Sequence, residues 1–94
     1  MSALHMAVQM RKLEMVDLIL MSSSLVDIDL FSETHGTPLI VASKVGDLKI
    51  AQRLIIRGAK IDLKDPILNK TAKELTENQK IIYLLEKYDY KPRP

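Results

Sequence analysis

The sequence contains no cysteine and few glycines or aromatic residues, and these absences exclude several classes of protein. Without cysteine there is neither a disulfide framework nor a thiol nucleophile. The three glycines form no phosphate-binding loop. One phenylalanine, three tyrosines and no tryptophan leave little to stack on nucleic-acid bases. No apolar run approaches about eighteen residues, so the sequence predicts no membrane insertion.

Charge further limits the possible partners. The net charge is only +2, although residues 1–36 carry a net −3 and residues 37–94 a net +5. A basic run falls in the middle of the chain: Lys44, Lys49, Arg53, Arg57, Lys60 and Lys64. Spread over two helices, these side chains would point in several directions, and a phosphate-binding patch needs more net charge. The sequence therefore predicts a solvated face and no nucleic-acid partner.

What the chain does contain is a stretch, TPLIVASKV at residues 37–45, with the chemistry of a short helix. Thr37 offers a side-chain oxygen to the free N–H groups of a helix start, and Pro38 suits the first helical position. Gly46 favours the left-handed backbone of a helix end, and Asp47 can cap a second helix that ends at the next glycine. Helices this short are unstable alone, so the pattern predicts an antiparallel pair.

This helix pair is repeated along the chain. SALHMAV at 2–8 matches TPLIVAS at 37–43, and LEMVDLIL at 13–20 matches LKIAQRLI at 48–55, both at an offset of 35. A third and shorter copy begins at Thr71 with TAKELTENQKIIYLLEKY. Self-similarity at a fixed period of this length predicts a stack of structural repeats.

The repeat resembles the ankyrin repeat, which has T-P-L, a short apolar helix, a glycine and a second helix followed by G-A. The copy TPLIVASKVGDLKIAQRLIIRGAKID matches that pattern along its length, and SALHMAV keeps its Leu-His-x-Ala core. The resemblance covers about residues 2–88. It implies an all-α ankyrin-repeat solenoid of stacked antiparallel helix pairs joined by β-hairpin loops. Repeats are expected at about 2–36, 37–70 and 71–88, with a coil tail at 89–94.

The sequence departs from the family pattern in several places. Arg11 and Lys12 stand where glycine is usual, so the first inter-helix turn is expected to be strained or differently closed. Ile40 replaces the usual histidine. The second hairpin, LKDPILNKT, is one residue longer than usual, and Asn69 is expected to take its left-handed position.

The two histidines do not form a catalytic or metal site in the sequence. His5 lies where the family uses histidine to bridge neighbouring units by hydrogen bonds, and His35 competes with Gly36 for the left-handed position of the first hairpin. Neither has a Ser or Cys partner at a known catalytic spacing or a second ligand pair for zinc. We therefore expect no catalytic residue, no metal, no cofactor and no enzyme activity. The serines at 22–24 are interpreted as a connector rather than a phosphorylation switch.

The resemblance implies a protein-binding module that docks its partner on the concave face, formed by the first helices and the hairpin tips. Carried onto this sequence, the candidate contact residues are Gln9, Met10, Phe31, Glu33, Thr34, Lys44, Val45, Lys64, Pro66 and Ile67. Four of them are apolar at positions that are expected to face solvent, namely Met10, Phe31, Val45 and Ile67, which favours contact with a partner. Phe31 is the expected anchor because aromatic residues dominate interface hot spots; the alternative is that it folds onto the next hairpin. The two lysines would flank an acidic rim.

The first helix pair lacks the polar outer face that end units of repeat arrays normally carry. Leu4, Ala7, Met15 and Leu18 are expected to lie uncovered, and further methionines add flexible apolar bulk: Met6, Met10 and Met21. The sequence therefore predicts self-association through residues 1–21, contact with another chain there, or upstream repeats that cover this face.

Two other functions remain open from the sequence. The chain could be a structural segment of a longer ankyrin array in a larger polypeptide, or a weak nucleic-acid or anionic-lipid binder that uses its basic second half. Binding that falls steeply with salt would favour the second of these. The absence of cysteine is compatible with an intracellular location, cytoplasmic or nuclear.

Overall fold

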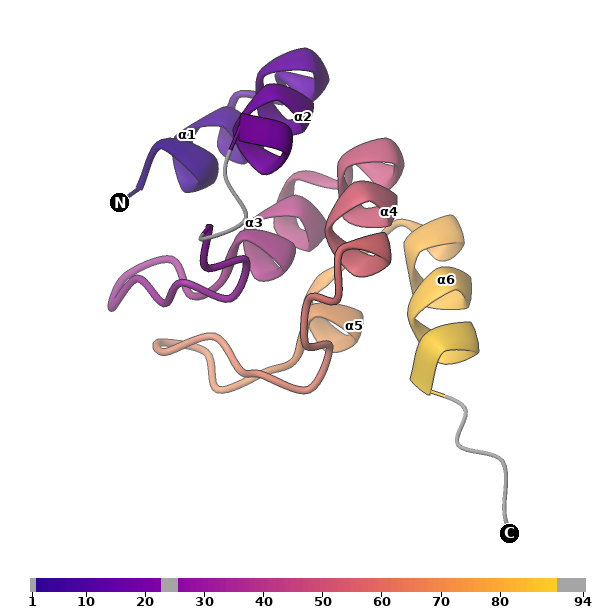
Figure 1. The fold of residues 1–94 in the computed structure, drawn as a ribbon. Coiled ribbons are helices and arrows are strands. Elements are labelled where there is room, and N and C mark those ends of the chain that lie inside the picture. The colour runs from indigo at the N-terminus through magenta and orange to yellow at the C-terminus, as the bar shows by residue number, and fades with distance from the viewer. Residues whose placement is uncertain (1, 23–25, 90–94) are drawn as a thin grey trace, which may run out of the picture.

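The computed structural model describes residues 2–22 and 26–89, and within these ranges the chain forms three helix–turn–helix pairs (Figure 1). In chain order the helices are α1 Ala3–Gln9, α2 Leu13–Ser22, α3 Pro38–Val45, α4 Leu48–Ile56, α5 Ala72–Leu75 and α6 Gln79–Asp89. Helices α1, α3 and α5 form one row, and α2, α4 and α6 form a second row. Consecutive pairs pack through both rows, so the chain is an all-α solenoid, as predicted.

Loops join the pairs and project from the stack beside the row of α1, α3 and α5 (Figure 1). The first hairpin, residues 26–36, is closed by an antiparallel bridge between Ser32 and Gly36. The second hairpin, residues 59–71, is closed by a bridge between Lys64 and Thr71. The predicted hairpin connections are therefore present, and among the described residues they are isolated bridges rather than extended strands.

Each repeat begins with a side-chain cap on its first helix. The hydroxyl of Ser2 accepts from the N–H of His5, and that of Thr37 accepts from the N–H of Ile40 at 3.3 Å. Thr71 forms a full capping box with Glu74, whose carboxylate returns to the Thr71 N–H at 3.0 Å. These bonds satisfy donors that have no partner within a helix. They explain why helices of four to eight residues start where they do.

Three helix ends share one left-handed motif. Arg11, Gly46 and Gly58 have φ of 58°, 77° and 90° and follow α1, α3 and α4. In each case the N–H of the next residue donates to the carbonyl five positions earlier, at 2.9 to 3.2 Å. Glycine adopts this backbone freely, whereas a residue with a Cβ does so at a cost. The expected strain of the first turn is therefore located at Arg11.

The hairpins also use left-handed residues. Asn69 has φ of 54°, as predicted, and Gly36 rather than His35 takes this role in the first hairpin with φ of 79°. A Cβ on Gly36 would lie 3.0 Å from Cδ1 of Ile40. Ile40, which stands where the family usually has histidine, is buried beneath this turn. The isoleucine thus fills the space that the glycine leaves.

The core is one cluster that runs through all three pairs. The predicted apolar side of α4 is buried at Ile50, Ala51, Leu54 and Ile55, and Leu48 packs at its edge. The other buried apolar residues are Leu4, Ala7, Val8, Val16, Leu20, Leu39, Ile40, Val41, Ala42, Ala59, Ala72, Ile81 and Leu85. Since no single pair encloses its own apolar side chains, each pair depends on its neighbours.

Two expectations are wrong in detail. Leu4 and Ala7 are buried, because the helix that carries them, α1, packs against both α2 and α3; Met15 and Leu18 are exposed as expected. Helix α6 continues through Asp89, one residue beyond the boundary set for the coil tail. The rest of that tail, residues 90–94, and two of the three connector serines, residues 23 and 24, lie outside the described residues.

Candidate protein-binding surfaces

The tips of both hairpins are held by a side chain at the same place in the loop. The hydroxyl of Ser32 accepts from the N–H groups of Thr34 and His35, at 3.4 and 3.2 Å. In the second hairpin, Oδ1 of Asp65 accepts from the N–H groups two and three positions later, both at 2.8 Å. Such local side-chain bonds fix the turn. The backbone of each tip is therefore held in a defined conformation, which fixes where its side chains begin.

The two hairpins lie side by side (Figure 1). The N–H of Lys60 donates to Oδ1 of Asp29 at 2.9 Å, which ties the start of the second loop to the first. Near the tips, a Cβ placed on Gly36 would lie 3.4 Å from Cδ of Pro66. The hairpins therefore form one continuous surface across two repeats.

Asp65 joins this surface to the end of α3. Its carboxylate is buried, and Oδ2 forms an ion pair with Nζ of Lys44, the only polar contact of that oxygen among the described residues. Removal from water raises the pKa of Asp65, but the Lys44 ammonium and the N–H groups of Leu68 and Ile67 outweigh this, so the pKa lies below its ordinary value. Asp65 is therefore charged at neutral pH and ties the tip of the second hairpin to the end of α3.

The predicted contact residues fall into three places. Six are exposed on the hairpins, where Phe31 is 51% and Ile67 70% exposed: Phe31, Glu33, Thr34, Lys64, Pro66 and Ile67. At the end of α3, Val45 is half-buried and Lys44 is held by Asp65. Gln9 and Met10 are exposed at the end of α1, and Met10 lines a groove described below.

Sequence reasoning missed two apolar residues of this surface. Leu30 is 43% and Leu68 54% exposed, and each stands next to an exposed apolar residue already singled out. The signal was present as two adjacent pairs, Leu30–Phe31 and Ile67–Leu68, in loops where polar residues are usual. Both hairpins therefore carry two consecutive exposed apolar side chains.

His5 forms a hydrogen-bonded bridge from α1 to the end of the first hairpin, just before α3, as the resemblance led us to expect. Its Nε2 lies 2.8 Å from the carbonyl oxygen of Gly36, and its Nδ1 lies 2.7 Å from the hydroxyl of Ser2. Because a carbonyl only accepts, Nε2 carries the proton and Nδ1 accepts from the hydroxyl when the ring is neutral. Nε2 thus holds α1 to the first hairpin, Nδ1 is bonded to the residue that caps α1, and the ring is buried.

Part of the basic run is engaged inside the molecule. Nε of Arg53 lies 3.1 Å from the carboxylate of Asp17, and Nη1 of Arg57 donates to the carbonyl of Leu20 at 3.3 Å. Both contacts join α4 to α2 in the preceding repeat. Together with the pairing of Lys44, they show that three of the six basic side chains have contacts within the molecule.

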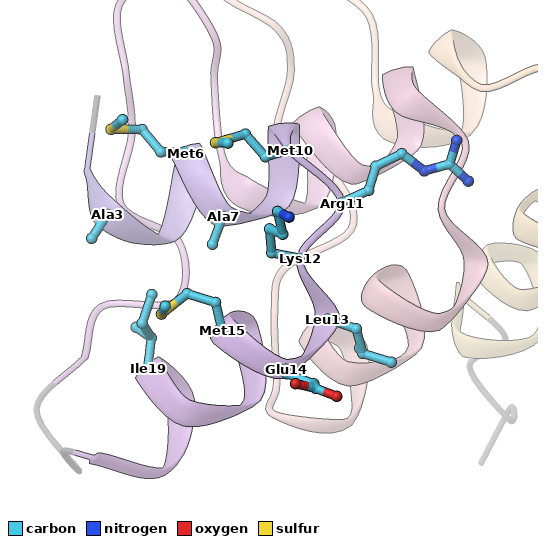
Figure 2. Close-up of a pocket in the computed structure, with 10 residues that line it drawn as sticks. All are labelled: Ala3, Met6, Ala7, Met10, Arg11, Lys12, Leu13, Glu14, Met15 and Ile19. Carbon is cyan, nitrogen blue, oxygen red and sulfur yellow. The ribbon is translucent and has the colours of Figure 1, made fainter.

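A second apolar surface lies at the other end of the stack. An open groove of about 830 Å³ runs between α1 and α2 on their outer side (Figure 2). It is lined by Ala3, Met6, Ala7, Met10, Arg11, Lys12, Leu13, Glu14, Met15 and Ile19. Seven of these ten side chains are apolar, and the charged ones gather at the turn between the two helices. We call this surface the upstream groove.

Two other kinds of site were sought in the described residues. No group of three or more His, Asp or Glu side chains is arranged to hold a metal ion in the ranges 2–22 and 26–89. Within the same ranges, no helix has the length and apolar character needed to cross a membrane.

The architecture defines a class, a helical-repeat solenoid with hairpin loops along one side. The family model for ankyrin repeats (3 copies) matches residues 1–65, so the chain belongs to the ankyrin-repeat family. Ankyrin repeats are generally protein–protein interaction modules and are typically non-catalytic. Comparison with curated proteins finds no match. Helices α5 and α6 lie beyond the matched residues, but they pack on α3 and α4 as the next repeat would.

Proposed function

We propose that this protein is a non-catalytic intracellular module that docks a partner protein on its two hairpin tips. One observation carries the proposal: adjacent hairpins each expose two consecutive large apolar residues, Leu30–Phe31 and Ile67–Leu68. Exposing such residues together is unfavourable unless a partner covers them. The ordered turns beneath them reduce the entropy lost on binding.

The charge around these residues refines the expected partner. Lys64 is exposed beside the second tip and can face an acidic group. Lys44, also expected to do so, is instead neutralised by Asp65, and in the first hairpin Glu33 adds a negative charge. We therefore expect an apolar segment of the partner to lie across both tips, with one acidic residue near Lys64.

We also propose that the chain comprises three repeats, at about residues 2–36, 37–70 and 71–88. The two tips then belong to the hairpins of the first and second repeats.

The first prediction removes the apolar side chains of the tips. Phe31→Ala combined with Ile67→Ala should weaken binding by at least about a hundred-fold, because each buried side chain contributes about 1.5–3 kcal/mol. Proteins captured by the immobilised chain would be purified and their affinities measured by calorimetry. Because both side chains are half or more exposed, the variant should unfold at the same temperature as the parent.

Tyr83→Ala is the matched control, since Tyr83 is as exposed as Ile67 but lies on α6 at the far side of the stack. It should leave the affinity unchanged. Equal affinities for the tip variant and the parent would remove the hairpins from the interface.

The alternative of nucleic-acid or anionic-lipid binding finds less support. Lys44, Arg53 and Arg57 have contacts within the molecule, which leaves fewer free cations for phosphate. Attraction to phosphate would also make affinity fall steeply with salt, whereas an apolar hairpin surface should give a shallow slope. Binding to duplex DNA and to anionic vesicles at two salt concentrations separates the two.

A further inference from the structure

The two hairpins carry opposite charges. In the first hairpin, residues 26–36, every formal charge at neutral pH is negative: Asp27, Asp29 and Glu33. The second hairpin, residues 59–71, has two aspartates and three lysines: Lys60, Lys64 and Lys70. One of these aspartates, Asp65, is buried and its charge is neutralised by Lys44. The surface formed by the two tips is therefore acidic on the first hairpin and basic on the second.

Two of the lysines flank the second tip. The N–H of Asp65 donates to the carbonyl of Lys70 at 2.8 Å, so the two limbs of the hairpin meet just below the tip. Lys64 and Lys70 stand on these facing limbs, and both are exposed. Glu74 lies near them, since its pKa is lowered by hydrogen bonds from Thr71 and also by the charges of both lysines. It offsets one of the two positive charges, and the tip remains basic.

The charges of the hairpins are not consumed by ion pairs inside the molecule. Among the ion pairs of residues 2–22 and 26–89, none includes an acidic side chain of the first hairpin or one of the three lysines. The hydrogen bond that joins the hairpins uses the backbone N–H of Lys60 and the carboxylate of Asp29, and leaves the lysine ammonium out. The unlike charges are therefore available to a partner.

We propose that the partner segment has unlike charges at its two ends, with a basic residue over Glu33 and an acidic residue at Lys64 and Lys70. These charges fix the direction in which the segment crosses the tips. The inference rests on the docking proposed above, because the apolar pairs on the tips hold the segment in place.

Charge at the rim of an interface acts mainly on specificity, because like charges that are brought together are costly. A segment lying in the reverse direction would place its acidic end on Glu33 and its basic end on the two lysines. It would be rejected although its apolar residues still fit, which is discrimination by repulsion.

The test uses short random peptides, displayed as a library and selected on the full chain. Peptides that occupy the tips are recognised because they fail to bind Phe31→Ala with Ile67→Ala. Such peptides should have basic residues on one side of an apolar core and acidic residues on the other. Exchanging the basic and acidic residues of one selected peptide should weaken its binding by about ten-fold. This difference should shrink at high salt, which screens exposed charges.

Glu33→Lys with Lys64→Glu exchanges the charges of the tips at constant net charge. This variant should bind the exchanged peptide as tightly as the parent binds the original, a rescue that a merely structural effect would not produce. Both side chains are exposed, so the unfolding temperature should not change. Glu77→Lys with Lys80→Glu is the matched control, since both residues are exposed beside the start of α6, away from the hairpins. It should leave the affinities of both peptides as they are in the parent.

The outcomes separate this inference from the docking itself. If no selected peptide depends on Phe31 and Ile67, docking on the tips is contradicted, and the charge order with it. If tip-dependent peptides bind equally well with their charges exchanged, only the charge order is overturned. A nitroxide at the basic end of a selected peptide should broaden the amide signals of residues 30–35 more than those of residues 64–70. The opposite pattern would also overturn the proposed direction.

Discussion

Arg11 and Asn69 adopt the left-handed backbone conformation that glycine adopts elsewhere in this chain. Arg11 takes the backbone conformation that Gly46 and Gly58 adopt at the equivalent helix ends. Its side chain is mostly exposed and approaches Asp47 at 3.4 Å, a contact of the kind that contributes little at a surface. The left-handed backbone is therefore retained without an evident compensating contact.

This predicts that Arg11→Gly stabilises the protein. The substitution relieves a left-handed residue, worth about 1–2 kcal/mol, and loses some of this to the greater freedom of glycine in the unfolded chain. A net gain of about 0.5–1 kcal/mol is expected, which is about 4 °C in melting temperature for a domain of this size. Arg11→Ala serves as control, since it removes the ion pair and keeps the strain. Calorimetry that places the glycine variant at or below the alanine variant would refute the strain at this turn.

At the scale of elements, the buried ion pair couples α3 to the second hairpin. Lys44, at the end of α3, pairs with Asp65 at the start of the hairpin tip, and Asp65 in turn holds the N–H groups of that tip. Removing the charge of Asp65 weakens both its ion pair with Lys44 and its bonds to the N–H groups of the tip. We expect Asp65→Asn to lower the free energy of unfolding by about 2 kcal/mol at neutral pH.

The free energy of unfolding that Asp65→Asn loses should become smaller as the pH falls. The pKa of Asp65 is lower in the folded protein than in the unfolded chain, where it is about 3.9. Its contribution is thus complete above about pH 4 and is lost as the pH falls through the lower folded-state pKa. Urea titrations of both proteins at a series of pH values should show a difference that shrinks in acid. Asp62→Asn controls for net charge in the same hairpin, and a difference that grows on acidification would be incompatible with a lowered pKa.

The elements also show what the sequence could and could not predict. The caps at Thr37, Asp47 and Thr71 were readable because each bond joins residues three apart. The pairing of Lys44 with Asp65 was not, because the two residues are 21 positions apart and meet only when the second hairpin folds back beside the end of α3. The burial of Leu4 was misjudged for a related reason. Sequence spacing defines the apolar positions of a short helix but does not fix which of them face downstream.

For the candidate contact residues, the sequence predicted which side chains are exposed better than it predicted which of them lie on the same surface. Phe31 and Ile67 were identified as apolar residues in loops, and the structure has them exposed. Met10 was assigned to the same face, yet it lines the upstream groove at the end of the stack. The position of a residue in its repeat indicates the side of the solenoid on which it lies. Whether it shares a surface with another residue depends on how neighbouring repeats are placed.

At the scale of the whole molecule, the two ends of the stack differ in chemistry, and this asymmetry can be reversed. The upstream groove is mostly apolar, whereas Lys73 of α5 and Glu86 of α6 form an exposed ion pair of 3.4 Å in the last repeat. Lys73→Leu with Glu86→Ile would give that repeat the residue types that the second repeat has at the matching positions, the buried Leu39 and Ile55. That apolar end should then seat on the upstream groove of another copy. Because a head-to-tail contact does not close, light scattering should reveal assemblies that grow with concentration. Adding Met15→Lys should stop the growth; a variant that assembles no further than the parent would show that the ion pair is not the cap.

The central claim is that a partner protein lies across the two hairpin tips, and amide chemical shifts test it most directly. The isotope-labelled chain would be titrated with a partner purified by capture, at a concentration where the protein is a single species. The largest changes are predicted at residues 30–35 and 64–68, with little change in α2, α4 and α6. Changes concentrated on those three helices, with the hairpins unaffected, would contradict it.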